Sequence, residues 1–265
     1  MKETTTLLPR FFLYSNRPSN GAKELANALS ARRIRPTGQY VGRSSHTIIN
    51  SGSTNPGVDF GLARVFNRPE LVARSSNKRD FFQNLQQQSS EVQVPQWTVD
   101  QSTARSWLET GCVVVARTVL NGHSGNGIII IESELDFVPA PLYTKYVKKE
   151  AEYRVHCIRG PQGARQFDIQ RKIKDPAFEG TPNWRVRNHH NGFIYIRDNI
   201  QVPQDVTGQA LLAFEASGLD FGAVDVIWNG HNQHAYVLEI NTAPGLVGRS
   251  VQSYKEAFIS AFVGS

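Results

Sequence analysis

The sequence AYVLEINTAPGL, from Ala235 to Leu246, places two polar side chains in an otherwise apolar strand. Its first four residues are apolar, and Glu239 and Asn241 follow two positions apart. Side chains alternate between the two faces of a strand, so these two residues share a face. A charged group among β-branched residues is costly unless it is paired or binds a metal. The first question about the fold and the function of the chain is therefore which charged group or metal ion Glu239 and Asn241 bind.

A second strand lies just upstream and carries another carboxylate. The sequence GAVDVIW contains Asp225, and the polar turn Asn229–His234 separates it from AYVLEIN, which predicts a hairpin. Two carboxylates and one amide on such a hairpin form an all-oxygen ligand set of the kind that Mg²⁺ prefers. A carboxylate that is paired with a nearby arginine is the alternative interpretation.

A glycine-rich loop, Gly122 to Gly127, connects the two β-branched strands GCVVVARTVL and GIIIIESE. Glycines let backbone amides approach phosphates closely. No GK[ST] and no helix follow, which excludes a Walker A loop and a dinucleotide fingerprint. A strand–loop–strand hairpin can still fold over a nucleoside triphosphate, and a plain hairpin turn explains the same residues. Arg117, on the entering strand, points either at the ligand of such a loop or at solvent.

The length and composition are those of a globular protein. The chain has 265 residues, of which 40% are hydrophobic and 20% charged, so one large domain or two small ones are expected. No apolar run reaches the roughly 18–20 residues that span a bilayer. The N-terminus does not read as a secretory signal, and Cys112 and Cys157 form no disulfide framework or metal motif. These features predict a reduced, intracellular protein without membrane association.

Positive charge is concentrated near the N-terminus. Residues 1–100 contain 13 Lys and Arg against 7 Asp and Glu, whereas residues 101–265 contain 16 of each. The densest basic cluster is ARRIRPTGQYVGR, from Ala31 to Arg43. Such an excess attracts a polyanion such as nucleic acid, or it is a solvated face that favours solubility.

Secondary-structure signals divide the chain into an α/β part and a β-rich part. A strand at 10–15, a helix at 20–31 and a strand at 46–53 predict a small α/β unit with a parallel sheet. A helix at 77–88 with Asn77 as its N-cap follows. Further strands are expected in GCVVVARTVL, GIIIIESE, PLYTKYV, EYRVHCIRG, ARQFDIQRKIK and the C-terminal hairpin, with helices at 205–219 and 253–263.

Taken together, these segments resemble the ATP-grasp superfamily, and most of all its carboxylate–amine ligases, such as those that add glutamate to a ribosomal protein and glutathione synthetase. The resemblance covers Leu71 to the C-terminus. It implies an α/β (α+β) fold with an N-terminal domain (1–95), a small subdomain with the glycine-rich loop (96–147) and a large subdomain with the metal site (148–265). EYRVH and RNHHNG are also similar to ATP-grasp proteins of tailed phages. The expected compartment is the cytoplasm, which would be the host's cytoplasm if a phage encodes the chain.

The resemblance implies which residues bind ATP. Lys78 and Arg117 are expected to reach the phosphates, although the family usually has lysine where Arg117 stands, and the two are not equivalent. The backbone around Lys145–Val147 resembles the hinge that reads the adenine edge, and Glu152 is placed for the ribose hydroxyls. The full set of implied nucleotide-binding residues is Lys78, Arg117, Gly122, Ser124, Gly125, Gly127, Lys145, Tyr146, Val147 and Glu152.

The resemblance also implies a catalytic set and a metal set. Cationic and amide side chains would stabilise the transferred phosphate and the acyl-phosphate intermediate: Arg154, Arg171, Arg185, Arg187 and Asn188. Two Mg²⁺ ions would be held by Asp225, Glu239 and Asn241.

The implied activity is ligation of a carboxylate to an amine at the expense of ATP, with ADP and phosphate as products. The substrates would be small molecules or peptides. Two alternatives stay open: an ATP-grasp protein that binds nucleotide without ligating anything, and a ligase whose acceptor is a peptide or is linked to nucleic acid. In the latter, the basic stretch Ala31–Arg43 would be the docking site.

Overall fold

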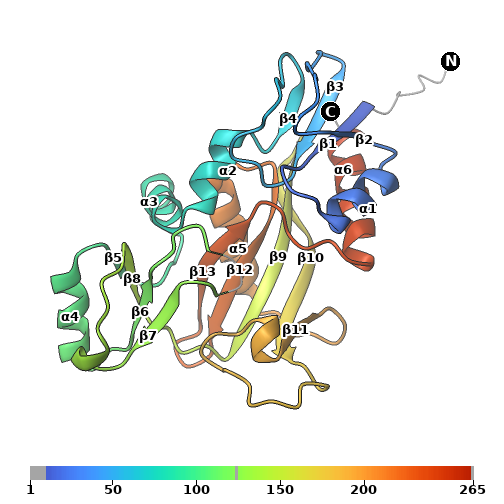
Figure 1. Cartoon of the computed structure of the whole chain (residues 1–265). Coiled ribbons are helices and arrows are strands. Elements are labelled where there is room, and N and C mark those ends of the chain that lie inside the picture. The colour runs from blue at the N-terminus through green and yellow to red at the C-terminus, as the bar shows by residue number, and fades with distance from the viewer. Residues whose placement is uncertain (1–9, 123–124, 264–265) are drawn as a thin grey trace.

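The computed structural model describes residues 10–122 and 125–263, and these form three β-sheets with helices between and around them (Figure 1). The N-terminal sheet lies at one end of the molecule, the largest sheet runs through its middle, and a small sheet lies to one side. The mixed α/β class expected from the sequence is confirmed. None of the helices in the described part of the chain is long and apolar enough to cross a membrane.

The N-terminal sheet is parallel, as the strand–helix–strand order predicts. Its strands, in the order β2-β1-β3-β4, are β1 (Arg10–Tyr14), β2 (Arg32–Ile34), β3 (His46–Asn50) and β4 (Arg64–Phe66). The sequence does not reveal β2 and β4, because three-residue edge strands are too short for an alternation to be read.

Two helices from opposite ends of the sequence cover one face of this sheet. Helix α1 (Asn20–Ala28) begins after Ser19, whose hydroxyl accepts a hydrogen bond from the Ala22 amide. Helix α6 (Arg249–Val263) begins four residues before its expected start and packs Tyr254 and Phe258 into the same core. The C-terminus of the chain therefore completes the N-terminal part of the molecule (Figure 1).

Two helices lead from the N-terminal sheet to the rest of the chain. They are α2 (Pro69–Ser76) and α3 (Lys78–Gln88). Asn77 caps α3 as predicted, because its side chain accepts hydrogen bonds from two amides of the first turn. Helix α2 was not expected from the sequence.

The small sheet is antiparallel, in the order β5-β8-β6-β7. Its strands are β5 (Trp97–Thr98), β6 (Val114–Arg117), β7 (Ile128–Ile131) and β8 (Leu142–Lys145). Helix α4 (Gln101–Glu109), which was not predicted, packs on this sheet beside a 3₁₀ turn at Glu134–Asp136. The sheet lies within the segment 96–147, and the division into domains remains a prediction.

The large sheet is antiparallel, in the order β11-β10-β9-β12-β13. Its strands are β9 (Ala151–Gly160), β10 (Gly163–Lys174), β11 (Phe193–Ile196), β12 (Phe221–Asn229) and β13 (His234–Asn241). Helix α5 (Gln204–Ser217) and α3 pack on one face through apolar side chains, among them Phe81, Phe214 and Val226. The opposite face carries alternate side chains toward a cleft.

Candidate active site

A cleft of about 1650 Å³ lies between the three sheets. It is lined by loops at the carboxyl ends of the N-terminal strands, by the glycine-rich loop, and by one face of the large sheet. Eleven Lys or Arg residues and four Asp or Glu residues line it. A concave site with such an excess of positive charge favours a polyanionic ligand such as a nucleotide triphosphate.

Three charged side chains form a row across the large sheet at the cleft. Arg154 on β9 lies directly opposite Asp225 on β12, and Asp225 lies directly opposite Glu239 on β13. Arg154 holds Asp225 with two hydrogen bonds, Nε to Oδ1 at 2.7 Å and Nη2 to Oδ2 at 2.8 Å. Burial alone would lower the pKa of Arg154, but the Asp225 carboxylate outweighs it and raises that pKa.

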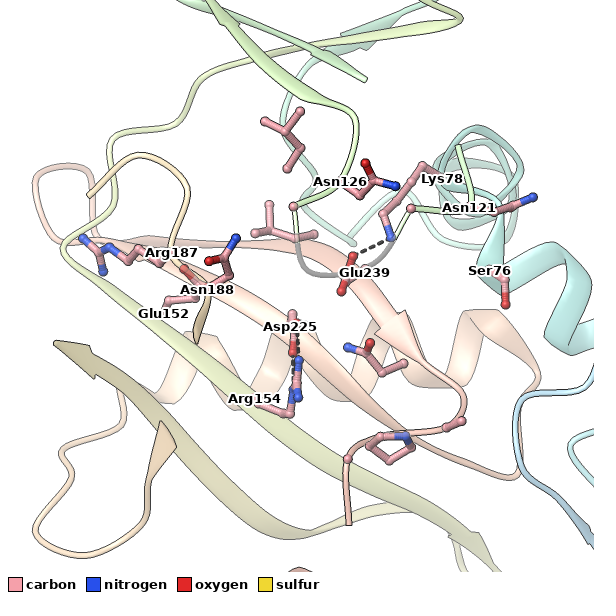
Figure 2. A pocket seen from close by; sticks show the side chains of 18 of the residues that line it. Ser76, Lys78, Asn121, Asn126, Glu152, Arg154, Arg187, Asn188, Asp225 and Glu239 are labelled. Carbon is pink, nitrogen blue, oxygen red and sulfur yellow. Dashed lines mark hydrogen bonds and ion pairs between the residues drawn. The ribbon is translucent and has the colours of Figure 1, made fainter. Parts of the chain in front are cut away.

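Glu239 has its own cationic partner. The Lys78 ammonium group pairs with Glu239 Oε2 (Figure 2), and both side chains are largely shielded from solvent. The Asn77 cap fixes Lys78 at the first helical position of α3. The Lys78 amide also donates to the Leu120 carbonyl at 3.1 Å, which ties α3 to the segment between β6 and the glycine-rich loop. The local sequence thus explains how Lys78 reaches the carboxylates.

Arg117 points into the same cleft. It ends β6, lines the cleft, and its Nε has no hydrogen-bond partner among the described residues. Burial lowers the pKa of Arg117, and Glu239 partly opposes that shift. A buried guanidinium with an unsatisfied donor is a ready partner for a phosphate oxygen.

The glycine-rich loop lies against a second loop, which follows β10 and contains Val186 and Asn188. Gly125 and Gly127 have φ angles of +83° and +75°, which favour glycine. A Cβ atom on Gly125 would lie 2.9 Å from Cγ1 of Val186 and 3.1 Å from Nδ2 of Asn188. Glycine at this position therefore allows the two loops to approach. Ser124, expected to bind nucleotide, lies outside the described residues.

Glu152 is buried and anchors a network of cations. Its side chain pairs with Lys172 and lies 3.3 Å from Lys149. Burial would raise the pKa of Glu152, but Lys172 and Lys149 together lower it, so Glu152 is a carboxylate here. The expected contact of Glu152 with ribose remains a prediction, because in this structure its oxygens face the two lysines.

The same lysines fix the loop that carries Arg185, Arg187 and Asn188 at the cleft. Lys149 Nζ donates to the Arg185 carbonyl at 3.1 Å, and Lys172 Nζ donates to the Arg187 carbonyl at 2.9 Å. Figure 2 shows Arg187 and Asn188 beside Glu152 at the cleft wall. Arg185 also pairs with Glu132 at 2.5 Å, after β7, which links this loop to the small sheet.

The expected adenine hinge lies at the end of β8. The Lys145 amide donates to the Gln96 carbonyl at 2.8 Å, and the Tyr146 amide donates to the Val113 carbonyl at 2.8 Å. Among the described residues, no partner is recorded for the Val147 amide, and all three hinge residues line the cleft. The Val147 amide is therefore the free donor that an adenine ring nitrogen could use.

Arg171 is the one expected catalytic residue that the structure places elsewhere. Across β9 and β10, Arg154 lies opposite Gln170, so Arg171 points to the other face of the sheet. It lines a separate cavity with Tyr153 and Gln204. Lys172, the next residue, faces the cleft instead. Side chains alternate along ARQFDIQRKIK, so Lys172 shares a face with Gln170, the partner of Arg154, and Arg171 does not. This alternation is the sequence signal that distinguishes Lys172 from Arg171.

The sequence analysis did not single out four further cleft cations, which are Arg17, Arg74, Lys149 and Arg197. Lys149 lies in a short loop without periodicity, so no pattern marks it. Arg197 follows β11, pairs with Asp168 at 2.9 Å and contacts the Ser250 hydroxyl. Only the return of α6 to the cleft brings Ser250 and Arg197 together, which a local pattern cannot reveal.

The donor set on β12 and β13 fits Mg²⁺ chemically. Asp225 and Glu239 supply carboxylates, and Asn241 Nδ2 donates to the Ala223 carbonyl at 3.5 Å, which leaves its own carbonyl oxygen for another partner. No cluster of three or more His, Cys, Asp or Glu residues with metal-binding geometry occurs in the described ranges. The remaining ligands would therefore be water and phosphate oxygens, as is common for Mg²⁺.

Comparison with known proteins identifies the fold. No protein-family model and no curated protein sequence matches the chain. Among solved structures, the ATP-grasp ligase PsnB with its minimal precursor superposes with a TM-score of 0.66 at 14% identity, over 96% of this chain and 100% of that one. An ATP-grasp RimK domain protein from Sphaerobacter thermophilus gives 0.62 at 15% identity, over 95% and 98% of the two chains.

A third structure agrees with these two. D-alanine–D-alanine ligase from Bacillus anthracis gives a TM-score of 0.62 at 14% identity, over 95% of this chain and 93% of that one. These superpositions extend over nearly the whole of each chain, including the N-terminal sheet. The chain therefore has the ATP-grasp fold, as the sequence resemblance implied.

Proposed function

We propose that the chain is an ATP- and Mg²⁺-dependent carboxylate–amine ligase that forms an amide or peptide bond and releases ADP and phosphate. The row Arg154–Asp225–Glu239, with Lys78 on Glu239, is the observation that carries this proposal. It places a carboxylate pair, which can hold a metal, beside cations that can hold phosphates. The superposed structures include ligases in complex with Mg and ADP, which supports the assignment.

The reaction would proceed in two steps. A substrate carboxylate oxygen attacks the γ-phosphorus of ATP, ADP leaves, and an acyl phosphate forms. An amine then attacks the acyl carbon, loses a proton, and expels phosphate as the new C–N bond forms. The protein's task is to position the reactants and to neutralise charge rather than to carry out acid–base chemistry.

Three cations would neutralise the phosphates of ATP. They are Lys78, Arg117 and Arg154, and all three line the cleft. Lys78 would exchange Glu239 for a phosphate oxygen, which frees Glu239 to bind metal together with Asp225 and Asn241. Bound Mg²⁺, of which we propose two, would neutralise the phosphate oxygens and fix their geometry.

The loop with Arg185, Arg187 and Asn188 would hold the transferred phosphoryl group and the developing oxyanion. The glycine-rich loop would cover the phosphates through Gly122, Gly125 and Gly127, with Ser124 between them. Its closure would exclude water from the acyl phosphate. Lys145, Tyr146 and Val147 would hold the adenine.

The substrates would be a small-molecule or peptide carboxylate and an amine. Superposed structures of PsnB contain precursor peptides, which supports a peptide as one of them. We place the enzyme in the cytoplasm, or in a host's cytoplasm if a phage encodes it.

The decisive experiment measures ADP release over a panel of amino acids, polyamines and peptides, with mass spectrometry of the products. A ligase gives ADP only when both a carboxylate and an amine are present, and the product mass equals the sum of the two minus water. In Glu239→Ala, turnover is expected to fall to background at saturating Mg²⁺ while the circular dichroism spectrum is unchanged. Glu215→Ala, which removes an exposed pair with Arg159, is the matched control.

Full activity of Glu239→Ala would refute the metal assignment. Nucleotide binding without turnover across the whole panel would favour the rival function, an ATP-grasp protein that binds nucleotide and ligates nothing. Arg117 in the place of the usual lysine and the basic N-terminal part of the chain are the features that favour this rival.

A further inference from the structure

The amino-terminal edge of the N-terminal sheet is a row of basic residues. Each of the four parallel strands begins with one: Arg10 in β1, Arg32 in β2, His46 in β3 and Arg64 in β4. The strands are parallel, and Arg10 pairs directly with His46, whereas Arg32 pairs with Phe12 and Arg64 with Thr47. The four first residues therefore lie within about two positions of one another near the same edge. Arg43 adds to the row, since its amide donates to Nδ1 of His46 at 3.3 Å.

We define the amino-edge patch as Arg10, Arg32 and Arg43 with the rings of Tyr40 and His46. The three arginines are exposed, and none of the ion pairs recorded among the described residues includes any of them. The surrounding sequence does not neutralise them. Residues 10–68 contain nine Lys or Arg and two Asp or Glu, whereas the rest of the chain has a net charge of −1.

The two rings of the patch lie among these charges. The Tyr40 hydroxyl lies 2.9 Å from Nδ1 of His46, and the two half-buried rings stack at 30° with centroids 5.9 Å apart. Burial, followed by the charges of Arg10 and Arg43, lowers the pKa of His46. Burial raises the pKa of Tyr40, and the charges of Arg10 and Arg32 partly oppose that shift. The Arg10 guanidinium lies 5.5 Å from the centroid of the Phe12 ring, and that centroid lies 5.4 Å from the Tyr40 ring and 4.4 Å from the His46 ring. A guanidinium group therefore lies against the same aromatic cluster.

The amino-edge patch is separate from the cleft. The cleft touches the opposite edge of the same sheet, through Ser15 after β1 and Ser51 after β3. A five-residue strand spans roughly 17 Å, so a ligand in the cleft does not cover the patch. A partner bound at the patch would therefore be distinct from the ligand of the cleft.

We propose that the amino-edge patch binds the phosphate backbone of a nucleic acid. Of the nine basic residues in 10–68, eight are arginine, and the planar guanidinium fork fits phosphate in two-point contacts. Rings between arginines add a surface on which a base can stack. An acidic protein would match the charge but would not use the rings, so nucleic acid is the better fit. This inference is independent of the proposed ligase activity.

The test is fluorescence anisotropy with a labelled single-stranded RNA of about 20 nucleotides, the same sequence as single-stranded DNA, and its DNA duplex. Wild-type protein is compared with Arg10→Gln/Arg32→Gln/Arg43→Gln. The matched control Arg79→Gln/Lys148→Gln/Lys174→Gln removes the same charge from exposed positions outside the N-terminal sheet. Circular dichroism and thermal unfolding verify that each variant is folded.

At least one of the three probes is expected to bind wild-type protein, and the comparison between probes identifies RNA, DNA strand or duplex as the source of the phosphates. Affinity should fall about 10- to 100-fold in the patch variant, and its log–log salt slope should be shallower by about 2–3. The control variant should stay within about threefold of wild type.

Three outcomes would overturn the proposal. One is no binding to any probe at about 50 mM salt. Another is an equal loss of affinity in the patch and control variants, since the effect would then follow net charge alone. The third is competition by polyglutamate as strong as that by unlabelled nucleic acid at equal charge, which would assign the patch to acidic proteins.

Discussion

At the residue scale, the ion pair between Arg154 and Asp225 matters both for the candidate active site and for the stability of the fold. The Asp225 side chain is 7% exposed, and Arg154 holds both of its oxygens. Arg154→Met is expected to cost about 3–5 kcal/mol in the free energy of unfolding, because it leaves a buried carboxylate without its partner. The double variant Arg154→Met/Asp225→Leu should recover most of that loss. Urea unfolding of the three proteins measures both effects, and equal stability of the two variants would contradict the pairing.

His156 lies two residues along β9 from Arg154 and is 1% exposed. Its Nδ1 lies 3.0 Å from the Tyr254 hydroxyl, and burial lowers its pKa from 6.5 to about 4. Between these pKa values the unfolded chain takes up a proton and the folded chain does not. The free energy of unfolding should therefore fall by about 2 kcal/mol from pH 7 to pH 5 on account of this residue.

Urea unfolding of His156→Gln at the two pH values checks this linkage. The variant should lose less stability than wild type on acidification, whatever its stability at neutral pH. His231→Gln, on the exposed turn between β12 and β13, provides the comparison for a histidine outside the core. An unchanged pH dependence in His156→Gln would show that the imidazole does not carry the effect.

At the scale of elements, the cleft depends on how closely two loops approach. Gly125→Ala introduces a Cβ atom against Val186 and Asn188, whereas Gly111→Ala introduces one into open space. Both glycines have positive φ, +83° and +79°, so both variants bear a similar backbone strain of about 1 kcal/mol. Only Gly125→Ala should also force the loops apart.

Gly125→Ala is therefore expected to reduce kcat/KM for ATP by about tenfold or more relative to Gly111→Ala, at a similar melting temperature. Steady-state ADP release and thermal unfolding of the two variants measure this. Identical kinetics would mean that the contact between the glycine-rich loop and the 183–188 loop has no part in turnover.

The sequence predicts those elements whose signals are local. The hairpin β12–β13 is recognisable because apolar runs flank a polar turn, and alternation then places Glu239 and Asn241 on one face. Alternation also contains the information that Lys172, rather than Arg171, faces the cleft, but only when it is counted from Arg154 across the β9–β10 pair. Register between strands therefore decides the roles of residues that look equivalent in the sequence.

At the scale of the whole molecule, the contacts that assemble the cleft are long-range and leave no local pattern. The pair Lys78–Glu239 joins α3 to β13, and α6 returns to cover the first sheet beside α1. The sequence indicates each partner as a residue of the right charge or apolarity. It does not indicate which distant partner each one meets, because many pairings satisfy the same charge and burial requirements.

Asn67 is the residue that joins the N-terminal sheet to the large sheet. It is fully buried at the end of β4 with φ +61°, and its amide donates to Asp220 Oδ2 at 2.7 Å. Its side-chain Oδ1 accepts from the amides of Asp220 and Phe221, and its Nδ2 donates to the Phe221 carbonyl at 2.8 Å. The side chain of Asn67 thus provides hydrogen-bond partners for the backbone groups of Asp220 and Phe221, where β12 begins.

Asn67→Gly keeps the positive φ accessible but removes these side-chain hydrogen bonds. We expect it to cost at least about 3 kcal/mol, because buried amides and a carbonyl at the start of β12 lose their partners. Asn199→Gly, at φ +55° on an exposed turn, controls for the backbone entropy of glycine. Urea unfolding and hydrogen exchange of the β3 and β12 amides should show loosening of both sheets in Asn67→Gly alone. Exchange that changes on one side only would mean that the two sheets are held together by α6 and not by Asn67.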